Sequence, residues 1–141
     1  MKKLKKSIIT ILTVAILLVS LTACSNSVPT YTKDEASDSN ITFKFAITDT
    51  NETSIANTSI NVVGEDANLI EIMDWYCAEN DINFVHDNGL VSVISDLESD
   101  MTDGWLLYVN DEMSMVGAAE YIPADGDNVE WKYVNYAEEF E

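Results

Sequence analysis

The chain has 141 residues and a formal net charge of −18, from 25 acidic side chains, 7 lysines and no arginine. Such a chain cannot neutralise nucleic-acid phosphates and is repelled by anionic lipid surfaces, which excludes a nucleic-acid-binding protein. With 47% hydrophobic and 9% aromatic residues, it is too apolar for a disordered acidic tail, so we expect one soluble globular domain.

Residues 1–23 have the layout of a secretory signal peptide. Four of the seven lysines lie in the first six residues, and an apolar run follows at residues 8–21. This run is shorter than the roughly 20 apolar residues that a membrane-spanning helix needs. We therefore expect the segment to be removed on export, which would leave 118 residues with 3 lysines, 25 acids and a net charge of −22.

The sequence Leu21-Thr22-Ala23-Cys24 resembles the lipobox of bacterial lipoproteins. In that family the chain is cut just before the cysteine, whose sulfur is acylated, so the resemblance implies lipidation of Cys24. Two or more acyl chains, at about 0.8 kcal/mol per buried CH₂, would anchor the protein stably. We expect it on the outer face of the cell membrane of a Gram-positive-type cell. The alternative is an ordinary cleaved signal followed by a coincidental cysteine.

Residues 24–40 contain this cysteine and then a stretch rich in Ser, Thr, Asp and Asn, which predicts a flexible linker. Once Cys24 is acylated, Cys77 has no disulfide partner, and we expect it to be a buried apolar residue. The alternative is a Cys77–His86 pair for thiol chemistry, because His86 is the only histidine.

The first half of the folded domain, residues 41–141, predicts a hairpin and one helix. Residues 41–48 alternate apolar and polar side chains, which is typical of a half-buried strand, and residues 58–63 are its expected partner. A helix follows, with its cap at Asp66 or Asn68 and its end at Asn80. The apolar side chains at helical spacing are Leu69, Ile72, Met73, Tyr76 and Cys77.

The second half predicts three short strands, at residues 90–94, 105–109 and 129–134. Residues 95–104 are acidic and are expected to form a loop. Asn110-Asp111 suits a tight turn that requires positive φ. Two strands, one helix and three strands predict an α+β domain, specifically a β-grasp (ubiquitin-like) mixed sheet packed on one helix.

Three segments of this half, residues 104–110, 116–121 and 125–133, together resemble the family called domain of unknown function 4430. They carry Gly104-Trp105, Val109-Asn110 and the turn Asp125-Gly126-Asp127. The resemblance covers roughly residues 66–135, and it departs from the family at Asp111, where Asn-Gly is usual. The family is related to the C-terminal β-grasp domain of transcobalamin and intrinsic factor.

The resemblance implies a binding or interaction module that is not an enzyme. In the transcobalamin relatives this domain packs against one face of cobalamin, and a helical domain covers the other face. We expect no helical domain here, so a corrinoid contact would be one-sided and weak, or would need a second protein. Fold alone does not carry function.

The candidate ligand-binding side chains lie on the aromatic strand and the loop after it. They are Trp105, Tyr108, Asn110, Met113, Met115 and Tyr121. Trp105 and Tyr108 are three residues apart on a strand and so lie on opposite faces. Whichever faces outward could stack on a planar ligand, and exposed methionines suit adaptable apolar recognition. The alternative is that the aromatic rings belong to the sheet core and the methionines cover it.

The acidic run Asp96, Glu98, Asp100 and Asp103 fails the EF-hand pattern, because position six lacks glycine and position twelve is Leu107. A weak divalent-cation site among clustered carboxylates stays an alternative. No phosphate loop, nucleophile elbow or His/Cys metal motif is present in the sequence, which predicts a non-catalytic protein without a bound metal or cofactor.

The function predicted from the sequence is a membrane-anchored extracellular binding module that captures a cobalamin-like small molecule and passes it to a transporter. The alternative is an envelope protein-interaction or adhesion module, stabilised by divalent cations. The expected partners are the membrane, through the lipid anchor, a corrinoid ligand, and a transporter or envelope protein.

Overall fold

A computed structural model of the chain describes residues 27–34 and 38–141. The predictions for the signal peptide and for Cys24 lie outside these residues. In chain order the elements are β1 (Thr30–Thr32), β2 (Asn40–Thr48), β3 (Ser54–Val63), α1 (Leu69–Glu79), β4 (Phe84–Asp87), β5 (Leu90–Ile94), β6 (Leu97–Glu98), β7 (Asp103–Val109), β8 (Glu112–Met113), β9 (Asn128–Asn135) and α2 (Tyr136–Glu139). Within the described ranges, neither helix is long and apolar enough to cross a membrane.

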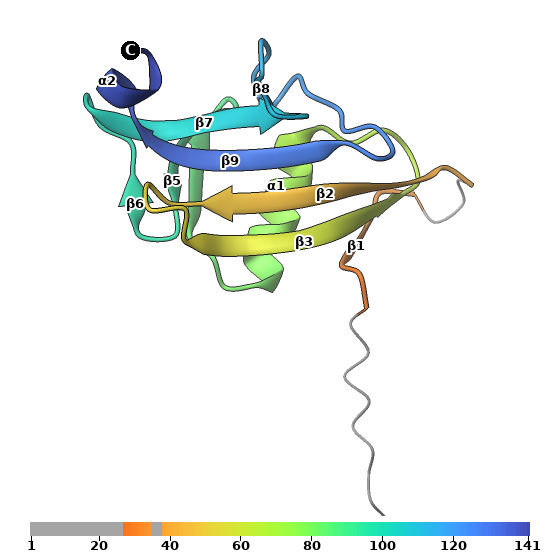
Figure 1. The fold of residues 1–141 in the computed structure, drawn as a ribbon. Coiled ribbons are helices and arrows are strands. Elements are labelled where there is room, and N and C mark those ends of the chain that lie inside the picture. Colours follow the sequence, from red (N-terminus) through yellow and green to blue (C-terminus); the bar gives the residue numbers. More distant parts are fainter. Residues whose placement is uncertain (1–26, 35–37) are drawn as a thin grey trace, which may run out of the picture.

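The larger of two sheets is mixed, with the strand order β1-β3-β2-β9-β7-β8 (Figure 1). At its centre β2 and β9 run parallel, with Phe45 opposite Val129 and Ile47 opposite Trp131. The hairpin β2–β3 and the pair β7–β9 are antiparallel. The α+β class predicted from the sequence is confirmed, and β1 and β8 form the two opposite edges of the sheet.

A second, three-stranded sheet has the order β4-β5-β6, which corrects the expectation of a single sheet and of a loop at residues 95–104. Only its central strand, β5, was expected. Its neighbours β4 and β6 have four and two residues, too few for a period-two pattern to be recognised. Figure 1 shows α1 and this smaller sheet on the same side of the larger sheet.

The core lies between these layers, because each contributes its apolar side chains to one interior. The larger sheet supplies alternate residues of its central strands, α1 supplies one face, and β5 closes the end. The residues with the least exposure are Phe43, Phe45, Ile47, Ile60, Leu69, Ile72, Met73, Cys77, Ile94 and Val129. Cys77 is 1% exposed and burial raises the pKa of its thiol to about 12. The expected buried, apolar role of Cys77 is therefore confirmed.

Helix α1 begins with a capping box formed by Asn68 and Glu71. The Asn68 side chain accepts a hydrogen bond from the Glu71 amide at 3.0 Å, and Glu71 accepts from the Asn68 amide at 3.1 Å. Of the two predicted caps, Asn68 is the one used. The exchange satisfies two amides that the first turn of a helix leaves without intrahelical partners.

Residues 29–33, named here the N-terminal strap, belong to the packed domain and correct the flexible linker predicted for residues 24–40. Strand β1 pairs with β3 in parallel, and the strap is joined to β3 by two backbone bonds, from Asn61 to Pro29 and from Lys33 to Val63. The Tyr31 ring also packs edge-on against Trp75, with centroids 5.7 Å apart. Tyr31 is the one large apolar side chain of the strap. Because of this, the sequence shows no apolar–polar alternation that would predict the strand.

Candidate ligand-binding site

An apolar hollow of about 320 Å³ opens beside the β8 edge of the larger sheet. This edge hollow lies between the start of β5, strand β7 and the segment that follows β8. Its volume falls at the small end of the range for small-molecule sites. Its lining residues are Gly89, Leu90, Val91, Trp105, Leu106, Leu107, Met113, Ser114, Met115, Val116, Gly117, Ala118 and Trp131.

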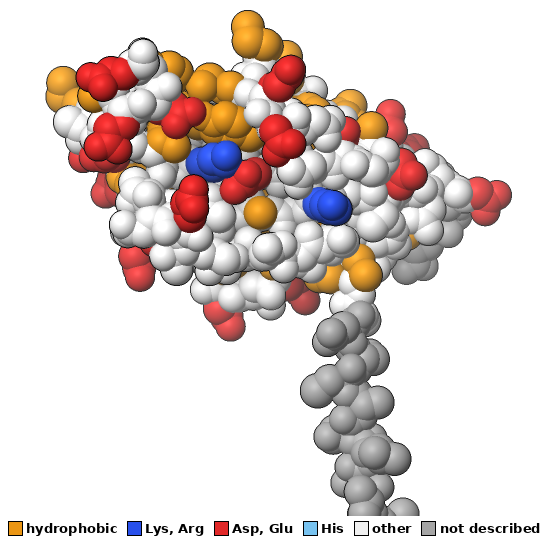
Figure 2. All heavy atoms as spheres, viewed as in Figure 1, with side chains coloured by type: hydrophobic (Ala, Val, Ile, Leu, Met, Phe, Trp, Pro, Cys, Tyr) orange, Lys and Arg blue, Asp and Glu red, His pale blue; other side chains and the backbone are white. Residues whose placement is uncertain are grey.

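Exposed apolar side chains converge on the edge hollow. Leu90 is 77% exposed and Met115 is 96% exposed, while Met113 and Val116 are 36% and 44% exposed. These are four of the nine large hydrophobic side chains that are exposed in the described part of the chain. Figure 2 shows hydrophobic side chains gathered along the β7–β8 edge, on a surface that is otherwise mostly polar. Single exposed apolar residues are ordinary, but a gathered set marks a binding surface.

Two tryptophans form the inner wall of the hollow, and they differ in hydrogen bonding. Trp105 donates from Nε1 to the Leu97 carbonyl at 3.0 Å, and its ring packs on Tyr133 with centroids 5.0 Å apart. Trp131 is 4% exposed, and its buried Nε1 has no hydrogen-bond partner among the described residues. An unsatisfied buried donor costs about 1–3 kcal/mol. A ligand acceptor that reached this indole would offset that cost.

The outer wall of the hollow, formed by residues 116–121, is hydrogen-bonded to the N-terminus of α1. The Leu69 amide donates to the Tyr121 carbonyl at 2.8 Å, and the Ile70 amide donates to the Ala118 carbonyl at 3.3 Å. On the other side Gly89, at φ +86°, lies so close to Ala119 that an added Cβ would be 2.4 Å from the alanine methyl. The wall is therefore held by two backbone hydrogen bonds from α1 and by the close approach of Gly89 to Ala119.

Tyr108 is not available for stacking, which corrects the expectation for the outward-facing aromatic residue. It does lie opposite Trp105, on the face of the larger sheet away from α1, as predicted. There the Lys132 ammonium lies 4.5 Å from the centre of its ring, and its hydroxyl donates to Glu139 of α2. Tyr108 is only 8% exposed. Burial, followed by the hydrogen bond to Glu139, raises the pKa of Tyr108 to about 12.

The side chains of Asn110 and Tyr121 form hydrogen bonds within the turns beside the hollow and do not line it. Asn110 and Asp111 have φ of 53° and 69°, which confirms the predicted tight turn. The Asn110 side chain donates to Asp127 at 3.0 Å, and the Tyr121 hydroxyl donates to the same carboxylate. Burial acts to raise the pKa of Asp127, but the bonds from Tyr121, Asn110 and the Ala124 amide outweigh it and lower the pKa.

Of the six predicted site residues, the structure thus brings three into the edge hollow: Trp105, Met113 and Met115. Sequence reasoning missed Leu90, Val116 and Trp131. Trp131 is also a residue of the hydrophobic core. Leu90 follows the turn at residues 87–89 directly, and an exposed leucine at the start of a strand has no pattern that distinguishes it from a core leucine.

The other candidate chemistry finds little geometric support. In residues 27–34 and 38–141, no three His, Cys, Asp or Glu side chains are grouped to hold a metal ion. Within the acidic run, Asp100 accepts hydrogen bonds from the amides of Thr102 and Asp103, which lower its pKa. His86 contacts Asp74 at 3.2 Å. A thiol such as Cys77, with its pKa near 12, stays protonated at neutral pH and is a poor nucleophile.

Two solved structures share the fold of this chain at low sequence identity. Haptocorrin in complex with Cbi matches with a TM-score of 0.60 and 20% identity, over 70% of this chain and 26% of the haptocorrin chain. A Ruminococcus gnavus ATCC 29149 protein, described as a "putative metal binding protein", matches with a TM-score of 0.50 and 15% identity, over 67% of this chain and 97% of its own. This chain therefore corresponds to about a quarter of haptocorrin.

No curated protein matches the sequence. A family match does exist, and it covers residues 66–135, from the residues before α1 to the end of β9. That range includes every residue that lines the edge hollow. It also coincides with the segment whose Gly-Trp, Val-Asn and Asp-Gly-Asp elements carried the resemblance. Residues 66–135 of this chain belong to the family "Domain of unknown function (DUF4430)".

Proposed function

We propose that this chain is a non-catalytic binding module of the β-grasp type, in which the edge hollow takes up part of an apolar small molecule. The observation that carries the proposal is the convergence of Leu90, Met113, Met115 and Val116 on a hollow walled by tryptophan. The chain is highly acidic, yet these side chains remain exposed at one edge. Their solvation is unfavourable until something covers them.

A corrinoid of the cobalamin type is the first candidate ligand. Its broad apolar ring could lie against the flexible thioethers of Met113 and Met115, which adapt to an irregular surface. The fold shared with haptocorrin, which was solved with Cbi, supports this candidate by analogy. The hollow is shallow, so we expect a one-sided contact of moderate affinity.

The same proposal includes the lipid anchor at Cys24 and a location outside the cell. Strand β1 forms the sheet edge opposite β8, and the two are separated by four strands. At about 4.8 Å between neighbouring strands, the strap and the hollow lie roughly 24 Å apart across the sheet. A chain anchored ahead of its strap would then present the hollow on the side of the domain away from the anchor.

The test is titration of the detergent-solubilised chain with dicyanocobinamide and cyanocobalamin, followed by absorbance and calorimetry. Met115→Ser should weaken binding about tenfold, because a thioether is lost from the contact. Met101→Ser is the matched control, since Met101 is also 96% exposed but does not line the hollow. Absence of binding at high micromolar ligand would reject the corrinoid, and equal effects of the two variants would reject the hollow as the site.

The second candidate is a protein-interaction module of the envelope that uses the same edge. It is favoured by the exposed methionines and by the two-residue strand β8, which leaves much of β7 without a strand neighbour on that side. The discriminating observation is a co-purified envelope protein whose capture is lost in the Met113→Ser/Met115→Ser variant and retained in Met101→Ser.

A further inference from the structure

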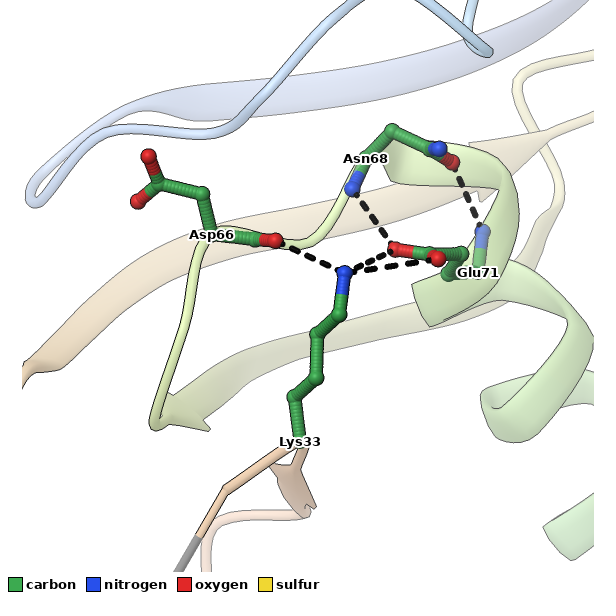
Figure 3. Close-up of polar contacts among 4 residues, drawn as sticks. All are labelled: Lys33, Asp66, Asn68 and Glu71. Atoms are coloured by element: carbon green, nitrogen blue, oxygen red, sulfur yellow. Dashed lines mark hydrogen bonds and ion pairs between the residues drawn. The ribbon is translucent and has the colours of Figure 1, made fainter. Parts of the chain in front are cut away.

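The N-terminal strap contacts α1 through the Tyr31 ring, which packs on Trp75, and through one ammonium, that of Lys33. Lys33 Nζ donates to the Asp66 carbonyl at 2.9 Å and to Glu71 Oε2 at 3.0 Å (Figure 3). The hydrogen bond to Glu71 raises the pKa of Lys33 above its usual value. Lys33 is the only cation of the strap, so this contact is where the strap meets the start of the helix.

Glu71 is also the residue that closes the capping box of α1. The oxygen that contacts Lys33 accepts from the Asn68 amide, while the Glu71 amide donates to Asn68 (Figure 3). Lys33 therefore neutralises the carboxylate that orders the first turn. The side chains of Lys33 and Glu71 are 32% and 40% exposed, so the ion pair itself is worth little. Its effect depends on what the first turn holds in place.

The first turn holds the outer wall of the edge hollow. The Leu69 and Ile70 amides follow Asn68 directly and donate to the carbonyls of Tyr121 and Ala118. Ala118 is 1% exposed and lines the hollow. Hydrogen bonds thus link the strap, at one edge of the larger sheet, through Glu71 and α1 to the hollow wall at the other edge.

We propose that the N-terminal strap is a positioning element for the edge hollow, so that docking of Lys33 on Glu71 and occupation of the hollow stabilise each other. This inference rests on the proposed function for its ligand, but the link from strap to wall is independent of any ligand. Coupling between two sites is reciprocal. Release of the strap weakens binding, and a bound ligand holds the strap down. Tension applied ahead of residue 29 would act on this contact and promote ligand release.

The experiment compares Lys33→Met with Lys44→Met in the full chain in detergent. Both variants remove one positive charge, but Lys44 lies exposed in β2, on the sheet face away from α1. Lys33→Met should speed amide hydrogen exchange at Leu69 and Ile70 and weaken dicyanocobinamide binding, each about fivefold. Lys44→Met should change neither. Glu71→Gln should reproduce the effect of Lys33→Met. The glutamine side chain can still accept the hydrogen bond from the Asn68 amide, but it carries no negative charge to pair with Lys33.

Reciprocity supplies a second readout. Saturating dicyanocobinamide should slow exchange of the Lys33 and Asn61 amides, which bond to Val63 and Pro29 in the strap contact, about fivefold in the wild-type chain. Circular dichroism should show that all three variants are folded. Unchanged exchange at Leu69 and Ile70 in Lys33→Met would overturn the inference, whether or not a ligand binds. Equal weakening by Lys33→Met and Lys44→Met would overturn it as well. If the wild type binds no dicyanocobinamide, the corrinoid fails, while the exchange rates still decide the strap.

Discussion

At one edge of the larger sheet, the three residues of β1 pair with β3, and Tyr31 and Lys33 reach over to α1. At the other edge, β8 has only two residues, and Leu90, Met113 and Met115 remain exposed beside it. Both edge strands are short, which limits pairing with a neighbouring sheet. At the β1 edge, however, the side chains of Tyr31 and Lys33 contact α1, while at the β8 edge the apolar side chains remain exposed.

This difference separates residues that stabilise the fold from residues that are free to bind. The side chains at the β1 edge make specific contacts with α1. At the β8 edge the backbone is equally well fixed, through Gly89 and the carbonyls of Ala118 and Tyr121, yet the side chains of Met115 and Leu90 are largely solvent-exposed. A rigid backbone that carries adaptable apolar side chains is what a binding surface needs, because little ordering is required when a ligand arrives.

The largest effect is expected from Gly89→Ala, which should cost about 2–4 kcal/mol of unfolding free energy. The added methyl would meet Ala119 at 2.4 Å, at a φ of +86° that already disfavours alanine. Gly126→Ala has the same φ but open space around it, so it should cost only about 1 kcal/mol. Gly117→Ala has neither feature and should stay within about 0.5 kcal/mol of the wild type.

Urea unfolding of these three variants measures how tightly the hollow wall is packed. The difference between Gly89→Ala and Gly126→Ala isolates the contact with Ala119 from the backbone strain that both share. If the two variants are equally stable, the wall at residues 116–121 can move away from β5. The contrast between a fixed backbone and free side chains at this edge would then be wrong.

A smaller effect is expected at alkaline pH from Tyr108, which lies on the closed face of the strand that borders the hollow. Its pKa is about 12 in the folded chain and about 10 when unfolded. The folded state therefore keeps its proton where the unfolded state has lost it. The corresponding stability is fully present below pH 10 and is lost as the pH rises towards 12. We expect this contribution to be about 1–2 kcal/mol.

The measurement is urea unfolding between pH 8 and pH 11.5 for the wild type and Tyr108→Phe. Phenylalanine does not titrate, so the variant should lose less stability over this interval, even if it is less stable at pH 8. Parallel pH profiles would show that Tyr108 titrates alike in both states. In that case Lys132 and Glu139 do not close the outer face, and the aromatic ring returns as a candidate for ligand stacking.

Local patterns predicted the central elements of the fold well. The alternation from Ile41 to Thr48 specified β2, and Asn110-Asp111 specified a turn with positive φ. For the start of α1 the sequence offered Asp66 or Asn68, and the structure uses Asn68. In each case the structural cause lies within a few residues of sequence. Strands β1, β4 and β6 were not predicted because each has at most four residues, and β1 also depends on pairing with β3, about 30 residues further along the chain.

The candidate site was predicted only in part, for a related reason. Met113 and Met115 belong to a single loop, and the sequence marked that loop. The edge hollow also needs Leu90, which is brought to it by the smaller sheet, and Trp131, which comes from the centre of the larger sheet. Such a site is created by tertiary packing of separate elements. Conversely, Tyr108 is not exposed for a ligand because its hydroxyl donates to Glu139 of α2, a helix that the sequence did not predict.

The smallest effect on stability is expected from calcium. It tests whether acidic side chains form a cation-binding surface in addition to the two sheet edges. In the described ranges no three acidic, His or Cys side chains form a metal-holding group, and we expect the acidity to act as a diffuse charge. Calcium chloride and sodium chloride of equal ionic strength should then raise the melting temperature by the same small amount, through screening of the negative charge. A clearly larger rise with millimolar calcium would instead support a cation-stabilised adhesion module. It would also show that carboxylates rearrange to bind the ion. Within the acidic run such a rearrangement is opposed by the hydrogen bonds that Asp100 accepts from the amides of Thr102 and Asp103.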